Sequence, residues 1–245
     1  MKKIVFAIPL LALAACEGSI ANAVGGSNGS MSDGERITTS DTNPGNFEGI
    51  SLAGPDNVVF TTSDNYSIRA EGDADVVERL RYELQDGNLK IGREKKTGWS
   101  GGYSSATVYV SAPSLKKAKL AGSGNLRADK LSGSEVAVSV AGSGNVNVDA
   151  VEADDLTARI SGSGDMNLAG QAKNVSANVT GSGVMKGKAL KTNDAVLKVT
   201  GSGDLTLTAD GTVDAKVTGS GDIRVHGKAK CTTKTTGSGE ITCGQ

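Results

Sequence analysis

The chain has 245 residues, enough for one large domain or two small ones, so its length alone does not fix the architecture. It contains 34 Gly, only 4 Pro and 3% aromatic residues, a mixture that suits tightly turning sheet structure and not a bundle of helices. Basic residues number 26 and acidic residues 27, so no basic surplus points to a nucleic-acid partner.

The first fifteen residues have the composition of an export signal. Lys2 and Lys3 precede an apolar run, Ile4–Ala15, which is too short to remain in a bilayer as a spanning helix. The run ends in Leu-Ala-Ala-Cys, which resembles the lipobox of bacterial lipoproteins and would make Cys16 the lipidated first residue of the mature protein. The alternative is ordinary cleavage after Ala23, in Ala-Asn-Ala, which would discard that cysteine.

A lipidated Cys16 would attach the protein to a membrane of the cell envelope. Glu17 follows it where Asp would be a retention signal, and this sorting pattern favours the outer membrane of a Gram-negative cell, with the periplasmic or surface side left open. Several acyl chains hold a protein durably, because each buried CH₂ contributes about 0.8 kcal/mol. We therefore expect a signal peptide at residues 1–15, a polar, Gly- and Ser-rich flexible tether at 16–46 and one folded domain at 47–245.

The folded part begins with residues 47–92, whose pattern predicts strands separated by polar turns. Asp86-Gly87 stands between two alternating runs and predicts a hairpin turn. Val76, Val77 and Leu80 are spaced for one face of a helix, which predicts either a short helix or a turn that leads into a strand.

A Gly-rich loop, Lys-Lys-Thr-Gly-Trp-Ser-Gly-Gly-Tyr-Ser-Ser, follows at residues 95–105 and precedes another strand. It contains Trp99, the single tryptophan of the chain, and Tyr103. These rings could stack on sugar rings, as aromatic side chains often do at binding surfaces, or fold back over the N-terminal part of the core. The loop is therefore a candidate ligand site with a purely structural alternative.

The remainder of the chain, residues 118–245, repeats one short motif. A Gly-Ser-Gly triplet occurs seven times at intervals of 18 to 20 residues, a near-constant period that indicates a repeat architecture. Mostly apolar residues stand two and four positions before each triplet and two positions after it, with polar residues between, so each repeat predicts two short strands with one inward face. The triplets begin at Gly122, Gly142, Gly162, Gly181, Gly201, Gly219 and Gly237.

Stacking of the repeats follows from their size, because one such strand pair would be no more stable than an isolated hairpin. Coils of about 20 residues are typical of a parallel β-helix, in which each coil pairs its backbone with its neighbours and equivalent apolar side chains form one core. Parallel crossovers of this kind are right-handed. We therefore predict an all-β fold, a right-handed parallel β-helix.

The last repeat has the features of a cap. Its inward positions become polar at Thr233 and Thr235, which suits the exposed end of a solenoid. Cys231 and Cys243 also fall at inward positions, and export would place them in an oxidising compartment where a disulfide persists. We expect a disulfide between them, and the alternative is two buried free cysteines that act as small apolar residues.

A family resemblance emerges from three segments. Val108–Leu126 combines a strand, a turn marked by proline and the first triplet, and it is preceded by Phe47-Glu-Gly-Ile50 and by Asp-Gly-Asn-Leu-Lys-Ile at 86–91. Together they resemble the autotransporter adhesin head domain, also called the GIN domain, over about residues 47–243. The resemblance implies an exported, often lipid-anchored β-helix with an adhesive role, and it transfers no catalytic or binding residues.

Two outward columns of the predicted coils carry polar chemistry. The residue after each triplet could line up carboxylates for a cation such as Ca²⁺, but Asn and Asp also favour turns, and we favour the turn role. The residue three positions before each triplet could form a basic stripe for acidic glycans, or simply a solvated face, and we favour the solvated face. The first column is Asn125, Asn145, Asp165, Val184, Asp204, Asp222 and Glu240, interrupted at Val184, and the second is Lys119, Ser139, Arg159, Asn178, Lys198, Lys216 and Lys234.

Catalytic chemistry finds little support. The triplets lack the lysine and following helix of a phosphate loop, the lone His226 ends a predicted strand, and the short uniform turns leave little to build a cleft. We therefore expect no catalytic residues, metal or cofactor, and predict a non-enzymatic envelope or surface lipoprotein, an adhesin-like module that binds a surface glycan or protein. The alternative is an envelope carbohydrate-binding protein or a polysaccharide-acting enzyme on the same scaffold.

Overall fold

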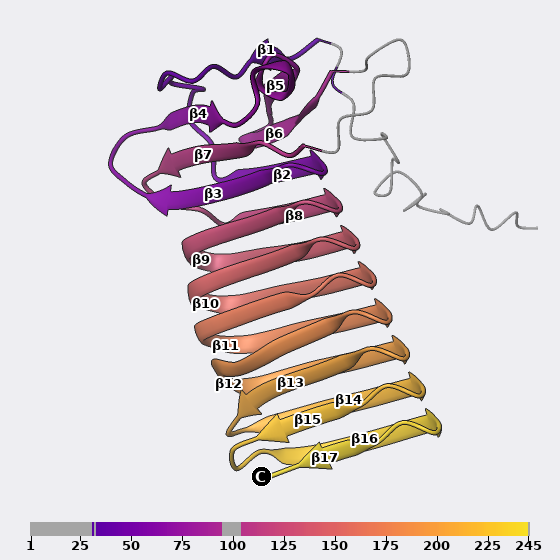
Figure 1. The fold of residues 1–245 in the computed structure, drawn as a ribbon. Coiled ribbons are helices and arrows are strands. Elements are labelled where there is room, and N and C mark those ends of the chain that lie inside the picture. Colours follow the sequence, from indigo (N-terminus) through magenta and orange to yellow (C-terminus); the bar gives the residue numbers. More distant parts are fainter. Residues whose placement is uncertain (1–30, 32, 95–103, 245) are drawn as a thin grey trace, which may run out of the picture.

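The computed structural model describes residues 31, 33–94 and 104–244 and shows a rod of stacked β coils, closed at its N-terminal end by a less regular unit (Figure 1). The described chain is nearly all β, with a β-solenoid of about 6 turns. Hydrogen bonds join all of its strands into one sheet that winds along the rod. The predicted all-β parallel solenoid is therefore confirmed.

The regular coils run from β8 to the C-terminal end of the rod. Equivalent strands pair in parallel, so that Leu126 lies opposite Val146 and Val146 opposite Met166, a register offset equal to the repeat of the sequence. The strands are β8 (Lys117–Gly122), β9 (Asn125–Gly142), β10 (Asn145–Gly162), β11 (Met166–Gly181), β12 (Val184–Gly201), β13 (Asp204–Ala209), β14 (Thr212–Gly219), β15 (Ile223–His226), β16 (Lys230–Gly237) and β17 (Ile241–Cys243).

In β9 to β12, one continuous strand covers both halves of a coil, where the sequence predicts two. The residues at the corner opposite the triplets stay extended and keep their partners: Glu152 and Ala153 pair with Ser132 and Gly133 of the preceding coil. The predicted inward positions are buried in every regular coil except the last. The buried residues that stand two positions after a triplet, for example, are Leu126, Val146, Met166, Met185, Leu205 and Ile223.

The Gly-Ser-Gly triplet is the tight corner of each coil, and both of its glycines are required. The first, Gly162, has φ +126, and a Cβ on it would lie 2.3 Å from the carbonyl oxygen of Gly142 in the preceding coil. The third residue, Gly164, would place a Cβ 2.1 Å from the carbonyl oxygen of Gly144. Between them, the amides of Ser163 and Gly164 both donate to the Gly142 oxygen, at 2.9 and 3.0 Å. The triplet therefore lets successive backbones stack in contact.

A further coil precedes the first triplet and is formed by β2 (Gly49–Gly54) and β3 (Asn57–Thr62). Its corner, Gly54-Pro55-Asp56, takes the place of a triplet, because Gly54 lies opposite Gly122 and its carbonyl oxygen accepts a hydrogen bond from the amide of Gly124 at 3.1 Å. Gly54 has φ +123, yet a Cβ there would meet nothing within 4 Å. Among the residues that the structure describes, no backbone stacks on this corner as each coil does on the next triplet.

Asp56 occupies the position of the third triplet glycine, and the free space at the first corner admits its side chain. Its carboxylate is fully buried and accepts hydrogen bonds from Arg93 Nε at 2.7 Å, from Arg93 Nη2 at 2.6 Å and from the amide of Ala106 at 2.8 Å. One carboxylate thereby ties the first coil to two later segments of the N-terminal unit.

The N-terminal unit closes the solenoid with antiparallel strands. β6 (Asn88–Arg93) and β7 (Thr107–Ala112) continue the parallel pairing beyond β2 and β3, and β5 (Leu80–Gln85) and β4 (Ser67–Glu71) then pair antiparallel with them. A reversal of strand direction ends the stack of equivalent coils, so this end presents no parallel edge onto which another coil could add.

The local predictions for this unit are confirmed. Asp86 and Gly87 connect β5 to β6 as a two-residue hairpin turn. Their φ values, +52 and +70, lie in the left-handed region, as the favoured turn of this length requires at both residues. The helical pattern becomes one short helix, α1 (Ala74–Val77), which buries Val76 and Val77 and leads directly into β5.

The expected boundary between tether and domain, at residue 47, is wrong. β1 (Glu35–Arg36) pairs antiparallel with β5, and Ile37 is buried in the core. The Tyr82 hydroxyl donates to Glu35 at 2.5 Å, and burial together with this carboxylate raises the pKa of Tyr82 to about 12. The domain therefore begins within the polar segment, because one buried isoleucine and strand pairing outweigh the composition around it.

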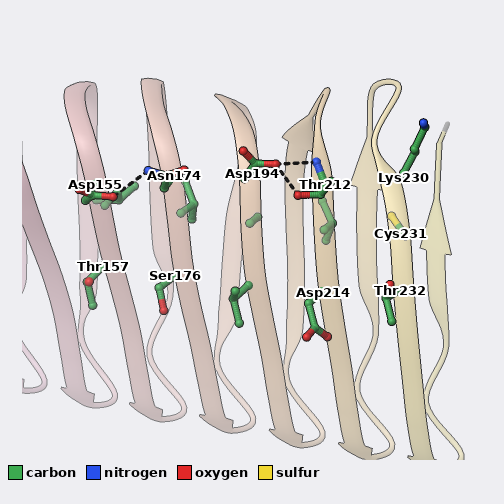
Figure 2. Close-up of a pocket in the computed structure, with 15 residues that line it drawn as sticks. Asp155, Thr157, Asn174, Ser176, Asp194, Thr212, Asp214, Lys230, Cys231 and Thr232 are labelled. Carbon is green, nitrogen blue, oxygen red and sulfur yellow. Dashed lines mark hydrogen bonds between the residues drawn. The ribbon is translucent and has the colours of Figure 1, made fainter.

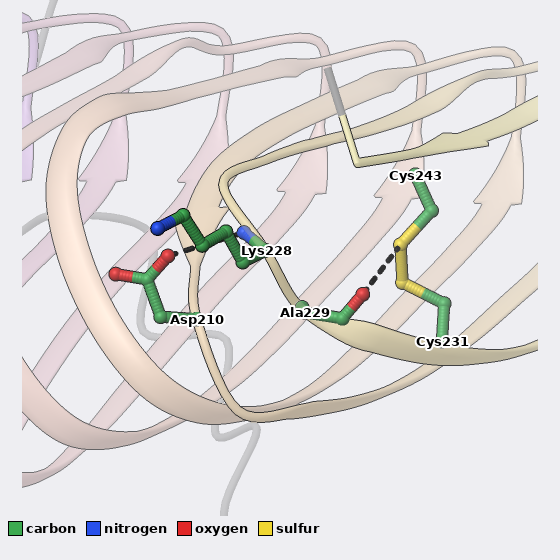
Figure 3. The surroundings of a disulfide bond; sticks show 5 residues. All are labelled: Asp210, Lys228, Ala229, Cys231 and Cys243. Carbon is green, nitrogen blue, oxygen red and sulfur yellow. Dashed lines mark hydrogen bonds between the residues drawn. A yellow bond between two sulfur atoms is a disulfide. The ribbon is translucent and has the colours of Figure 1, made fainter.

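The last coil ends the rod with polar residues and a disulfide between Cys231 of β16 and Cys243 of β17, whose Cα atoms are 6.5 Å apart (Figure 3). Thr233 and Thr235 lie opposite the buried Ala215 and Val217 of the preceding coil and are exposed. The end of the core is thus covered by hydroxyl-bearing side chains, as expected of a cap.

Candidate functional site

The long face is a regular surface of the rod. We define it as the outward side chains seven, five, three and one residue before each triplet, which are Asp155, Thr157, Arg159 and Ser161 in β10. Because coils stack in register, each of these positions forms a column along the rod, with neighbours about 4.8 Å apart. A ligand on this face would meet a similar set of groups once per coil.

A shallow groove of about 600 Å³, the lateral groove, follows two columns of the long face (Figure 2). Buried Leu156, Val175, Ala195 and Val213 form its floor. Val196, with 44% of its surface exposed, adds an apolar patch. One row of polar side chains consists of Asp155, Asn174, Asp194, Thr212 and Lys230. The second row contains Val196 and the polar residues Thr157, Ser176, Asp214 and Thr232.

Hydrogen bonds between coils organise one wall of the lateral groove. Asn174 Nδ2 donates to Asp155 Oδ1 at 2.9 Å, and Asp194 accepts the Thr212 amide at 2.8 Å and the Thr212 hydroxyl. These bonds from Thr212 hold the pKa of the Asp194 carboxyl below its ordinary value. The wall is therefore preorganised, and its Asp194 carboxylate stays ionised in neutral solution.

A second hollow of about 710 Å³ lies around the corner opposite the triplets. Lys173 Nζ pairs with Asp154 at 2.7 Å on its rim, and the buried Thr192 hydroxyl donates to the carbonyl oxygen of Lys173 at 2.9 Å. Lys173 and Asp154 thus neutralise each other across two coils at this rim.

The column after the triplets forms a ladder between coils. The side-chain oxygen of Asn145 accepts the amide of Asp165 at 3.3 Å, and that of Asp165 accepts the amide of Val184 at 3.2 Å. Asp222 likewise accepts the amide of Glu240 at 3.0 Å. These contacts support the turn role, with Val184 as a gap. Among residues 31, 33–94 and 104–244, no three His, Cys, Asp or Glu side chains gather in a group that could hold a metal ion.

The basic column places three lysines of the last coils in register. Lys198, Lys216 and Lys234 lie opposite one another in β12, β14 and β16 and are exposed. Within the described part of the chain none of them forms an ion pair, whereas Lys130 pairs with Glu152 of the next coil at 2.6 Å. This column adjoins the lateral groove on the long face.

Several predicted residues lie outside the described residues: Cys16 with its alternative cleavage site, and the loop residues Trp99 and Tyr103. No helix in the described ranges is long and apolar enough to span a bilayer. Neither the lateral groove nor the buried Asp56 was predicted from the sequence. The groove could have been found by aligning the residues seven and five positions before each triplet. Asp56 could have been found by aligning Gly-Pro-Asp-Asn at 54–57 with Gly-Ser-Gly-Asn at 122–125.

Comparison with known proteins agrees with this architecture. A family model described as "Putative auto-transporter adhesin, head GIN domain" matches residues 46–229. No curated protein matches the chain. Among solved structures, a "putative adhesin" of Bacteroides fragilis is similar with a TM-score of 0.78 and 21% identity, over 87% of this chain and 99% of that one.

Two further crystal structures share the fold. A "putative lipid binding protein" of Parabacteroides distasonis matches with a TM-score of 0.66 and 23% identity, over 86% of this chain and 100% of that one. A "putative adhesin" of Parabacteroides merdae matches with a TM-score of 0.67 and 22% identity, over 87% of this chain and 98% of that one. At such identities the likeness shows the fold alone.

Proposed function

Because the chain belongs to the family of the auto-transporter adhesin head GIN domain, we propose that it is an exported, lipid-anchored module of the cell envelope that binds a surface glycan or protein on its long face. In this proposal Cys16 carries the lipid, residues 17–32 hold the rod away from the outer membrane, and the coils present the binding surface. The protein performs no catalysis.

The lateral groove is the observation that carries the proposal. It offers hydroxyl, amide and carboxylate groups at a constant spacing, open to solvent along the rod. An extended polymer or strand could lie along it and repeat the same contacts from coil to coil, so that several weak contacts add up. A small molecule would be poorly enclosed by so shallow a surface.

A hydrolytic role fits the lateral groove less well. A glycosidase pairs a carboxylate with a carboxylic acid whose pKa is raised, so that the acid can protonate the leaving oxygen. The pKa of the Asp194 carboxyl in the lateral groove is lowered, which is the opposite direction. Its oxygens are also engaged by Thr212, which suits a fixed acceptor for a ligand's hydroxyl or amide group.

A glycan array probed with the mature protein tests the binding role, and Val196→Arg tests the site. Val196 is exposed in the lateral groove, so a long cationic side chain there should obstruct a ligand without disturbing the core. Ser143→Arg is the matched control, because it adds the same side chain at an exposed triplet corner. We expect binding by the wild type and the control and loss in V196R. Equal binding by both variants, or turnover of a bound polymer, would overturn the proposal.

The anchor is tested separately by growing cells with an alkyne analogue of palmitate. We expect labelling of the wild type, loss of the label in Cys16→Ser and recovery of the labelled protein in the outer-membrane fraction. An unlabelled mature protein that begins at Val24 would establish ordinary cleavage after Ala23 instead.

A further inference from the structure

Three consecutive coils carry the same six residues, Lys-x-Thr-Gly-Ser-Gly, beginning at Lys198, Lys216 and Lys234. Lys198 lies opposite Lys216 and Lys216 opposite Lys234, and the threonines two residues later are in the same register. All six side chains are exposed on the long face. We call this set the Lys–Thr stripe, and it consists of Lys198, Thr200, Lys216, Thr218, Lys234 and Thr236.

The Lys–Thr stripe costs stability as it stands. Neighbouring coils are about 4.8 Å apart, and like charges directly opposite one another in adjacent strands are destabilising. Within the described part of the chain, no carboxylate lies at ion-pair distance from these three ammonium groups, although Asp214 stands on the same face two residues before Lys216. Folding alone therefore gives no reason for this arrangement.

Some cations of the solenoid are compensated by a neighbouring coil. Arg127 pairs with Asp149 at 2.8 Å and Lys130 with Glu152 at 2.6 Å, and in both pairs the carboxylate belongs to the following coil. In the Lys–Thr stripe, by contrast, Lys198 faces Lys216 and Lys216 faces Lys234 across the coils. The stripe therefore places like charges where these pairs place opposite ones.

We propose that the Lys–Thr stripe binds a linear acidic polysaccharide, whose carboxylate or sulfate groups provide the counter-charge. The chain of the polysaccharide would run along the rod axis, with one ammonium group and one threonine hydroxyl available to an anionic group at each coil. Exposed hydroxyls beside the lysines suit the hydrogen-bonding groups of sugars, whereas insertion into a lipid surface would need apolar side chains there. No aromatic side chain stands in the stripe to stack on nucleic-acid bases.

The inference rests on the proposed binding role and names the ligand chemistry of one part of the long face. The probe is polygalacturonate, and its fully methyl-esterified form is the control that keeps the backbone and removes the charge. We expect the mature protein to bind polygalacturonate in a salt-dependent manner and to ignore the ester. Equal binding of both polymers, or stronger binding to vesicles containing phosphatidylglycerol, would overturn the inference.

Variants locate the interaction. Replacing Lys198, Lys216 and Lys234 together by Gln should weaken binding to polygalacturonate by about tenfold or more, if each exposed contact contributes in the usual range. The control triple of Lys188, Lys191 and Lys228 to Gln removes the same charge from exposed positions elsewhere on the rod. Far-ultraviolet circular dichroism confirms that both triples fold.

The outcomes separate the two proposals. Affinity that survives the stripe triple, or falls equally in the control triple, contradicts the stripe. Absence of any polygalacturonate binding also contradicts it, while a neutral glycan on the array that V196R abolishes would leave the binding role intact. No binding to any glycan or protein ligand would remove the binding role itself.

Discussion

The two glycines of each triplet should fail for different physical reasons when they are replaced by alanine. Gly54→Ala introduces a side chain at φ +123 where no atom lies within 4 Å. Gly164→Ala forces a Cβ to within 2.1 Å of a carbonyl oxygen and 2.8 Å of Val140 Cγ1, without positive-φ strain. Gly162→Ala combines φ +126 with a 2.3 Å approach. The three variants therefore separate backbone strain from stacking.

The expected losses follow from these geometries. A strained positive φ costs about 1–3 kcal/mol. Overpacking against a neighbour that can shift only by separating two coils costs about 1–3 kcal/mol as well. Alanine also restricts the unfolded chain, which returns about 0.4–1 kcal/mol in each variant. Gly162→Ala should accordingly lose about 0.4–1 kcal/mol more than the sum of the losses of Gly54→Ala and Gly164→Ala, since the strain and overpacking costs add but the return from the unfolded chain occurs only once.

The free energy of unfolding is measured by urea denaturation followed by circular dichroism. Ser163→Ala is the matched control, because its exposed side chain stands between the two glycines and its truncation should change stability by less than about 0.5 kcal/mol. A Gly164→Ala protein as stable as this control would refute the stacking requirement. A Gly162→Ala protein no less stable than Gly54→Ala would refute it independently.

Four further variants or titrations probe single contacts. Asp56→Ala should lose about 3–5 kcal/mol in urea unfolding, because it leaves a guanidinium group that is only 12% exposed without its counter-charge; an Asp56→Asn protein as unstable as the alanine variant would argue against charge as the cause. Val184→Asn should gain about 1 kcal/mol by filling the ladder after the triplets, and a loss of stability would contradict that ladder. Cys231→Ser should lose about 3 kcal/mol and speed hydrogen exchange in β16 and β17 before β9. The pKa of Tyr82 is raised to about 12 in the folded protein, against about 10 in the unfolded chain. Its contribution to stability should therefore be complete below about pH 10 and disappear as the pH rises to about 12. An ultraviolet absorbance titration, run beside alkaline unfolding, would follow both changes.

Most of the fold could be predicted from the sequence because the inward and corner positions obey a strict period. Each regular coil before the last buries the residue two positions before its triplet and turns on the same two glycines, so these positions keep their pattern although others vary. The first coil was not recognised as part of the repeat because Pro55 and Asp56 stand in place of the usual Ser and Gly. That replacement is possible only where no earlier coil packs against the corner, which is a property of the stack and not of the repeat.

The candidate site was less predictable for a related reason. A groove formed by Asp155, Asn174 and Asp194 brings together residues 19 or 20 positions apart, and only the register of the coils shows that they are neighbours. Composition likewise placed the start of the domain too late, because Ile37 makes its contribution through contacts with β5 and not through a local pattern. The local sequence pattern therefore predicts the turns of the coils, whereas the surface grooves depend on which strands pair over long range.

The outward columns are where function has to be sought in such a rod. A substitution at an inward position disturbs the stack, so those positions are held by folding, whereas an outward position can change in one coil without affecting the next. Paired charges such as Lys130 and Glu152 still have a structural explanation, because the two coils stabilise each other. The uncompensated column at Lys198, Lys216 and Lys234 has none, and it therefore supplies the strongest reason to look for a ligand outside the chain.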